Sequence, residues 1–338
     1  MRKYLLPENA NSYKANLHTH TDWSDGQFPP EEVKRLYKDQ GYSIIAYTDH
    51  DVFLQHNDLT DDTFLALNGY EMEVNQAKTD INLPSECGKT CHMCLIATDP
   101  DMVTPVCWHR EKYLFRNAVN HRAEVKNDES LPDYERVYSG EGISEMMTLG
   151  REHGFFVTYN HPGWSMEQYN DYTAYNGMHA MEIINNECLA MGYNDRNEKV
   201  YEEMLNAGKR IYCIATDDCH GLRGMFGGAT VIMADKLEYK SVTDALMKGN
   251  FYATEGPEIK KLYVEDGKLY VETSAVDNIR LNTGTRLAKI VRNGNGTLVT
   301  RAVFDLPTDK NLYYIRVTLT DKGGKCAYSN AYFMDEIN

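Results

Sequence analysis

The sequence contains histidines with the spacing of metal ligands. His18 and His20 are separated by one residue. On a strand, residues i and i+2 point to the same face, so both imidazoles can reach one metal ion. The pair alone is weak evidence, because histidines also occur on surfaces and in cores.

Further residues of ligand type stand near the ends of expected strands. They are Asp25, His50, Glu71, His92, His161, Asp218 and His220. Imidazoles combined with carboxylates suit Zn, Mn or Fe, whereas oxygen ligands alone would favour Mg or Ca. Nine ligands are too many for one ion. The sequence therefore predicts a cluster of two or three ions, bridged by Glu71, that hydrolyses its substrate through a metal-bound hydroxide.

Short apolar runs predict the strands that position these residues. The runs lie at 14–17, 43–47, 64–67, 93–97, 155–159, 181–184 and 211–215. Amphipathic stretches at 30–40, 144–153, 199–207 and 241–248 are each followed by glycine, a typical helix stop. This alternation predicts an α/β fold with a parallel sheet, open or closed into a barrel, whose functional groups lie at the carboxyl ends of the strands.

Two stretches depart from this alternation. Residues 110–136 are charged and weakly periodic, and we interpret them as an insertion or lid. After Pro257, short alternating segments at 261–265, 269–273, 298–304 and 313–319 predict a small β domain. We therefore expect a catalytic domain at 1–257 and a β-sandwich-like domain at 258–338.

The motifs resemble those of the PHP (polymerase and histidinol phosphatase) family, over roughly residues 15–257. The resemblance rests on His18-Thr19-His20, Ser24-Asp25-Gly26, Thr48-Asp49-His50-Asp51, Glu71, His92, His161-Pro162 and Asp218-Cys219-His220. Residues 252–257 also resemble the end of the catalytic domain in stand-alone members that carry a small β domain.

The resemblance implies a distorted seven-stranded (β/α) barrel with two or three metals at its C-terminal face. By position, His18, His20, Glu71 and Asp218 would hold one ion. Glu71, His92 and His161 would hold a second, and Asp25, His50 and His220 a third. Every ligand position is filled, which favours a catalytic member over a degenerate one.

The expected function is that of a metal-dependent phosphoric ester hydrolase. Three divalent ions would bring a charge of about +6 and their carboxylates about −3, so phosphate would be attracted. The catalytic candidates are Asp218, His220 and His50. Arg223 is either a bidentate phosphate ligand or a solvated surface residue. We expect a small phosphorylated substrate, including nucleotides and oligonucleotide ends.

Two other functions use the same residues. One is hydrolysis of carboxyl esters, amides or carbamates, and the other is a non-catalytic regulatory module whose metals are structural. The second would leave the β domain free to engage a partner. Alternatively, the β domain covers the barrel, forms a homo-oligomer interface or contributes a wall of the substrate site.

Several residues have two interpretations. Asp49 and Asp51 either orient ligand imidazoles or cap the following turn. Either Asp217 or Asp218 could be the ligand, and the spacing to His220 favours Asp218. Cys87, Cys91 and Cys94 have the spacing of a zinc knuckle, but no second pair completes it, so we expect free thiols.

The composition bounds the remaining possibilities. The net charge of −15 argues against a general nucleic-acid-binding surface, although a metal cluster can still attract anions. No apolar run has the length of a signal peptide core or a membrane span, and a chain of 338 residues needs no disulfides. We expect a cytoplasmic protein with eight free cysteines.

Overall fold

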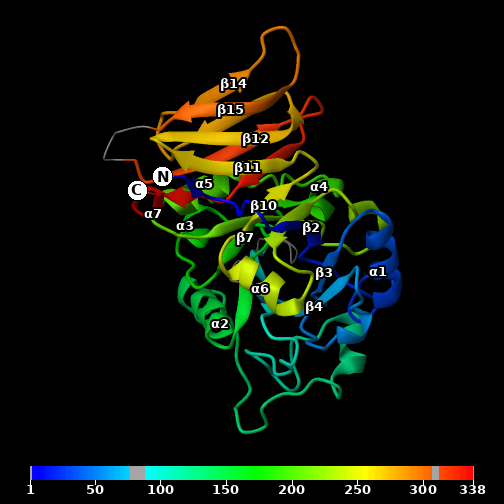
Figure 1. Cartoon of the computed structure of the whole chain (residues 1–338). Helices are drawn as coiled ribbons and strands as arrows, with labels where there is room; N and C mark the ends of the chain where they lie inside the picture. The colour runs from blue at the N-terminus through cyan, green and yellow to red at the C-terminus, as the bar shows by residue number, and fades with distance from the viewer. Residues whose placement is uncertain (1, 77–87, 307–311, 338) are drawn as a thin grey trace.

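The computed structural model describes residues 2–76, 88–306 and 312–337. They form a mixed α/β structure with a large sheet, parallel in part, and an additional all-β region formed by the C-terminal strands (Figure 1). The mixed class and the all-β region agree with the sequence prediction.

The predicted strands are all present, but the sheet is only partly parallel. β2 (Asn11–Asn16), β3 (Ile44–Tyr47) and β4 (Leu65–Asn75) run parallel, as do β6 (Phe155–Tyr159), β7 (Ala180–Asn185) and β8 (Tyr212–Thr216). β5 (Thr90–Ala97) lies between these groups and is antiparallel to both neighbours. The end of β4 pairs with the start of β5, an antiparallel arrangement that requires no crossover connection.

Two antiparallel strands that the sequence analysis missed extend the sheet beyond β2. They are β9 (Ala229–Ala234) and β10 (Phe251–Thr254). The hydroxyl of Thr230 on β9 also bonds to the N–H and the carbonyl of Ala215 on β8, at 3.2 and 3.0 Å. Side-chain hydrogen bonds therefore connect β9 to the far end of the strand order.

The predicted helices form where the glycine stops place their ends. They are α1 (Pro30–Asp39), α2 (Gly140–Glu152), α5 (Glu198–Asn206) and α6 (Tyr239–Met247). Short helices are α3 (Tyr169–Tyr172), α4 (Asn186–Ala190), α7 (Met334–Ile337), η1 (Asn57–Leu59), η2 (Arg116–His121) and η3 (Leu222–Gly224). Within the described ranges, none of the helices is long and apolar enough to cross a membrane.

The C-terminal strands form two packed sheets. One is a four-stranded sheet in the order β1 (Lys3–Tyr4), β11 (Ile259–Glu265), β12 (Lys268–Val276) and β15 (Val299–Asp305). β13 (Asn278–Asn282), β14 (Lys289–Arg292), β16 (Tyr314–Thr320) and β17 (Cys326–Ser329) continue the large sheet through β10, and β18 (Tyr332–Phe333) pairs with β16. The first residues therefore lie with the last, and both termini are side by side in Figure 1.

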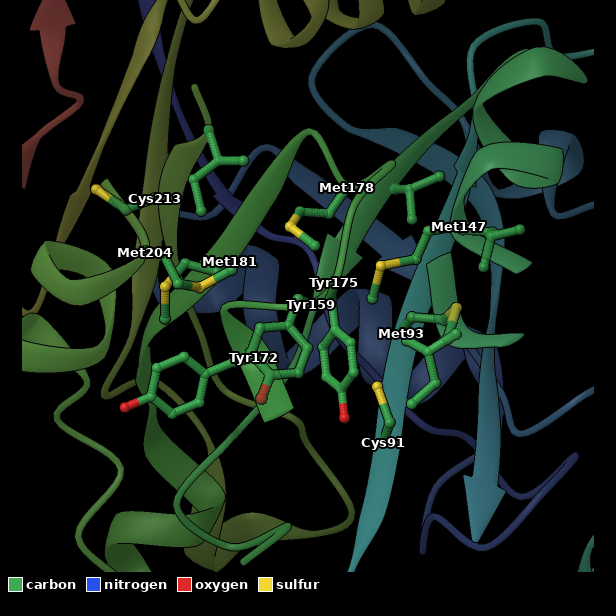
Figure 2. Packing of buried hydrophobic residues seen from close by; sticks show 14 of the residues in the cluster. Cys91, Met93, Met147, Tyr159, Tyr172, Tyr175, Met178, Met181, Met204 and Cys213 are labelled. Carbon is green, nitrogen blue, oxygen red and sulfur yellow. The ribbon is translucent and has the colours of Figure 1, made fainter. Parts of the chain in front are cut away.

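Methionine and tyrosine side chains fill much of the main core. Figure 2 shows Met93, Met147 and Met181 with Tyr159 and Tyr175 packed against the strands. Flexible thioethers fill irregular gaps between rigid rings, which suits a sheet with changing strand direction. The seven described cysteines form no disulfide, and Cys87 lies outside the described residues.

Residues 110–136, interpreted above as an insertion or lid, contain only the short helix η2 and otherwise follow an irregular path. In Figure 1 this segment lies on the side of the molecule away from the C-terminal strands. Asn117 fixes it to the loop before α1, because its backbone N–H donates to the Ser24 carbonyl at 3.0 Å and its side chain donates to the Asp22 carbonyl at 3.0 Å.

Candidate metal centre

The structure brings all nine predicted ligands to one edge of the sheet. His18 and His20 follow β2, His50 follows β3, Glu71 lies in β4, His161 follows β6, and Asp218 and His220 follow β8. These are carboxyl ends of parallel strands, as predicted. His92 instead lies near the start of β5, and it reaches the same edge because β5 runs in the opposite direction.

Three overlapping groups of side chains have metal-ligand geometry. Within each group the candidate ligand atoms lie within 4.8 Å of one another. The groups are His18, His20, Glu71 and Asp218; His50, Glu71 and His92; and His20, Asp25, His50 and His220. They correspond to the three sets implied by the resemblance, except that His20 joins the third and His50 takes the place of His161 in the second. His161 lies in none of the three groups, although its Nε2 is 3.3 Å from Glu71 Oε1.

Glu71 lies at the centre of this arrangement. Its Oε1 is 3.2 Å from His18 Nε2, 3.2 Å from His92 Nδ1 and 3.3 Å from His161 Nε2. Its Oε2 is 3.3 Å from His20 Nε2 and 3.4 Å from His50 Nδ1. Each carboxylate oxygen therefore faces a different part of the cluster, which is the arrangement of a bridging ligand.

Acceptors outside the cluster hold the second ring nitrogen of four histidines. His18 Nδ1 lies 2.7 Å from Glu182, and His92 Nε2 lies 3.4 Å from Glu73. The Nδ1 atoms of His161 and His220 contact Ser165 Oγ and the Asp218 carbonyl, at 3.2 and 2.9 Å. A neutral imidazole that donates from one nitrogen presents the lone pair of the other, so these contacts orient the rings for metal binding.

Glu182 on β7 is a functional residue that the sequence analysis missed. Its buried carboxylate accepts hydrogen bonds from the His161 N–H at 3.0 Å, the Asn185 amide at 2.8 Å and the Thr216 hydroxyl at 2.6 Å, in addition to the contact with His18. A glutamate inside the apolar run at 181–184 was the available signal, because a buried charge needs such partners.

Two neighbouring aspartates have different environments. Asp218 faces the cluster, with Oδ1 3.2 Å from His18 Nε2 and 3.1 Å from His20 Nε2. Asp217 points away and accepts backbone N–H groups from residues 226, 227 and 228. The geometry agrees with the choice of Asp218. Asp218 and His161 also have positive φ angles of 52° and 25°, a strained conformation that recurs at functional sites.

Within the part of the chain that the structure describes, the carboxylates of Asp49 and Asp51 bond neither to the ring nitrogens nor to the following turn. Asp49 accepts from the backbone and hydroxyl of Thr21, both at 2.7 Å, and from Ser24 at 2.6 Å, so it fixes the loop that carries Asp25. Asp51 forms a buried 2.5 Å ion pair with Arg136. Gly26 completes the loop, because a Cβ there would lie 2.5 Å from the His20 carbonyl oxygen.

The proximity of so many titratable groups shifts their pKa values. Burial lowers the pKa of His20, but the carboxylates of Asp218 and Glu71 outweigh it and raise that pKa to about 10. Burial and the nearby His20 lower the pKa of His50 to about 4. Burial raises the pKa of the Glu71 carboxyl, but His18 and His92 reverse this effect and hold it well below its usual value. The cluster is thus strongly coupled.

The residues fit divalent metal ions. Several buried polar atoms in the cluster have close neighbours but no partner with hydrogen-bond geometry among the described residues, namely Nδ1 of His20, His50 and His92, and Oδ1 of Asp218. Such an atom costs about 1–3 kcal/mol when buried without a partner. Cations coordinated by these imidazoles and carboxylates would remove that cost, and this donor set suits Zn, Mn or Fe.

The cluster opens into a cavity of about 430 Å³. Trp164 forms one wall, and its ring meets those of His92 and His161 edge-on at 5.3 and 5.1 Å. Arg223 also lines the cavity, but its guanidinium is paired with the buried carboxylate of Glu187. The cavity provides a space for substrate directly above the candidate ligands.

Cys91 and Cys94 are buried on β5 and are not part of a zinc knuckle with described partners. Cys94 Sγ lies 3.1 Å from the Asn160 amide, which also donates to Glu71 at 2.9 Å. Burial raises the pKa of the Cys94 thiol to about 11. It is therefore a neutral thiol beside the cluster.

No family model and no curated protein matches the sequence. Among solved structures, a two-domain protein from Bacteroides vulgatus that contains a predicted PHP-like metal-dependent phosphoesterase matches with a TM-score of 0.44 and 15% identity, over 98% of each chain. A candidate metal-dependent phosphoesterase from Bifidobacterium adolescentis has a TM-score of 0.37 and 14% identity, over 63% of this chain and 90% of its own.

A third neighbour is an amidohydrolase from Chromobacterium violaceum with bound sulfate and no metal. It has a TM-score of 0.38 and 17% identity, over 61% of this chain and 87% of its own. The structural neighbours thus include PHP-like metal-dependent phosphoesterases, at low sequence identity. These similarities are weak, so the chemistry of this chain follows from its own residues.

Proposed function

We propose that this protein is a metal-dependent phosphoesterase of PHP type that acts on a small phosphorylated molecule. The observation that carries the proposal is the set of three overlapping ligand groups beneath one cavity. Six histidines supply neutral ligands and three carboxylates supply charge, so a full complement of divalent ions would leave the site positive. A phosphate ester is the substrate class that this charge favours.

The nine side chains would hold two or three Zn, Mn or Fe ions. His18, His20, Glu71 and Asp218 would form one site, and Glu71, His92, His161 and His50 a second. Asp25, His50, His20 and His220 would form a third. Shared residues such as Glu71 would couple the sites, in agreement with its two differently placed oxygens.

Divalent ions, when bound, would neutralise the charge of a phosphate ester and lower the pKa of a water molecule, so that hydroxide is available near neutral pH to attack phosphorus. The chain itself orients the ligands. Glu182 and Glu73 hold protons on the outer nitrogens of His18 and His92. Glu187 fixes Arg223 beside the cavity, where one edge of its guanidinium could contact a substrate oxygen. Trp164 limits access of bulk water from one side.

For the fold, we propose that β2–β8 form the distorted seven-stranded barrel of the PHP family. Support comes from Thr230, whose hydroxyl links β9, the neighbour of β2, to Ala215 on β8. We also propose that the catalytic domain ends near Pro257, where the Thr254 hydroxyl bonds the Pro257 carbonyl at 2.6 Å. The first strand, β1, nevertheless packs with the C-terminal region.

The test is a hydrolysis assay with purified protein loaded with Mn, Zn or Fe. p-Nitrophenyl phosphate, bis-p-nitrophenyl phosphate and p-nitrophenyl acetate report on monoester, diester and carboxyl ester cleavage. We expect phosphate ester cleavage that His50→Ala and Asp218→Asn abolish. Glu152→Gln, an exposed change at the end of α2, is the control that should retain activity.

Three results would contradict the proposal. Cleavage of the acetate ester or of amides without any phosphate ester would assign the site to acyl substrates. Absence of all hydrolysis by the metal-loaded protein would favour a regulatory module. Cleavage of a phosphate ester that survives in both variants would place the activity outside this cluster.

A further inference from the structure

The segment at 110–136 places two side chains in the wall of the metal-centre cavity. Phe115 and Arg116 both line this cavity. The Phe115 ring meets the His50 imidazole edge-on, with centroids 5.6 Å apart, and the Arg116 guanidinium lies 5.1 Å from the same ring. One aromatic ring therefore connects a candidate metal ligand to a cationic group.

Arg116 differs from Arg223, the other arginine that lines this cavity, in whether a carboxylate pairs with its guanidinium. Glu187 already neutralises Arg223. Among the described residues, no carboxylate lies within ion-pair distance of Arg116. Its guanidinium instead lies over the Phe115 ring. The chain has 50 acidic and 35 basic side chains, so acidic groups are in excess. The Arg116 guanidinium, beside an acidic cavity, nevertheless remains available to a ligand. That ligand would be an anion, because a guanidinium has only donors.

The backbone holds Arg116 in this place. Its φ angle of 47° is in the left-handed region, which non-glycine residues rarely adopt. The next residue, Asn117, makes two hydrogen bonds to the loop that carries Asp25. Trp23 of that loop also stacks on His121 of η2, with centroids 5.1 Å apart. These contacts tie the position of Arg116 to that of the metal-ligand loop.

We propose that Arg116 is a specificity-determining residue that binds a second anionic group of the substrate, a carboxylate or a phosphate on the alcohol that leaves. This inference rests on the proposed phosphoesterase function. The reacting phosphate belongs at the ligand cluster, where the metal charge would neutralise it. Arg116 contacts the Phe115 ring, which in turn contacts His50, so it would meet a part of the substrate other than the reacting phosphorus. The substrate class is therefore a phosphate ester with an anionic leaving group.

The experiment compares matched esters in Arg116→Gln. 3-Phosphoglycerate and glycerol 3-phosphate differ by a carboxylate, and fructose 1,6-bisphosphate and fructose 1-phosphate differ by a phosphate. We expect kcat/KM for the more anionic member of at least one pair to fall about 10- to 100-fold, mainly through KM, with little change for its partner. Arg116→Lys should retain part of the preference. The pair that responds identifies the anionic group.

Arg286→Gln is the matched control, because it removes the same charge from an exposed position in the C-terminal region. It should change neither preference. A second readout is binding of 3-phosphoglycerate and of fructose 1,6-bisphosphate to the metal-free protein, followed by the fluorescence of tryptophan, since Trp164 lines the same cavity. Arg116→Gln should weaken binding of one of them at least tenfold.

The two proposals fail in distinguishable ways. If wild-type protein hydrolyses no phosphate ester, the proposed function fails and the binding measurement alone decides the role of Arg116. Equal losses for both members of each pair would show that Arg116 binds the reacting phosphate, and this would overturn the inference. Unchanged kinetics or unchanged binding in Arg116→Gln would overturn it as well.

Discussion

Replacement of Glu182 by glutamine tests how the protein prepares its ligands. The carboxylate receives two donors on each oxygen: His18 Nδ1 and Thr216 on Oε1, and the His161 N–H and Asn185 on Oε2. Glutamine keeps the shape but turns one of these oxygens into a donor. If the amide nitrogen replaces Oε2, the His161 N–H loses its acceptor. If it replaces Oε1, His18 must accept at Nδ1 and carry its proton on Nε2, the nitrogen that faces the cluster.

Either arrangement is costly in a fully buried position. An orphaned buried donor costs about 1–3 kcal/mol of unfolding free energy. Loss of an orienting partner typically lowers metal affinity or activity about 10- to 100-fold. We therefore expect Glu182→Gln to bind Zn or Mn at least tenfold more weakly in a chelator competition. Glu152→Gln serves as the control. Wild-type metal affinity in Glu182→Gln would refute the orienting role.

Three further predictions follow from buried charges. Arg136→Met should cost about 3–5 kcal/mol in urea unfolding, because it leaves the Asp51 carboxylate buried without its partner; a loss below about 1 kcal/mol would contradict this. Asp218→Asn should lose metal while it stays folded. Asp217→Asn should mainly lose stability, by about 1–3 kcal/mol, because Asp217 accepts three backbone N–H groups. Metal analysis and melting curves distinguish the two variants. Burial raises the pKa of Glu167 to about 7 despite hydrogen bonds from three tyrosines, so its folded pKa exceeds the unfolded one. The stability that Glu167 contributes is fully present below pH of about 4 and is lost as the pH rises through about 7. The free energy of unfolding of wild type relative to Glu167→Gln should therefore fall between pH 5 and pH 8. The fall is up to about 1.4 kcal/mol for each unit of pKa shift. A difference that is constant or grows with pH would contradict the assignment.

Local patterns predicted much of the fold. The apolar runs found β2–β8, and glycines after amphipathic stretches found the ends of α1, α2, α5 and α6. The local sequence did not determine the direction of each strand. β5 is antiparallel to β4 because the start of β5 pairs with the end of β4. The sequence analysis missed β9, although residues 229–234 are mostly apolar.

Candidate ligand residues could be proposed from the sequence because the ability to bind a metal ion belongs to individual side chains. Histidines and carboxylates are the usual ligands of Zn, Mn and Fe, and the structure places eight of the nine candidates in overlapping groups, with His161 next to Glu71. Their supporting contacts depend on tertiary packing. Asp49 was expected either to orient a ligand imidazole or to cap the following turn, and it instead accepts hydrogen bonds from Thr21 and Ser24. Arg116 lies in a segment without periodicity, so only the structure shows that it lines the cavity.

The metal content of the purified protein tests the central claim most directly. Inductively coupled plasma mass spectrometry after Zn or Mn loading and desalting should find two to three ions per wild-type chain. Glu71→Gln should lower this number by at least one, because Glu71 contacts the groups on both sides. Glu152→Gln should leave it unchanged. Less than one ion per wild-type chain, or the same content in Glu71→Gln, would contradict the account.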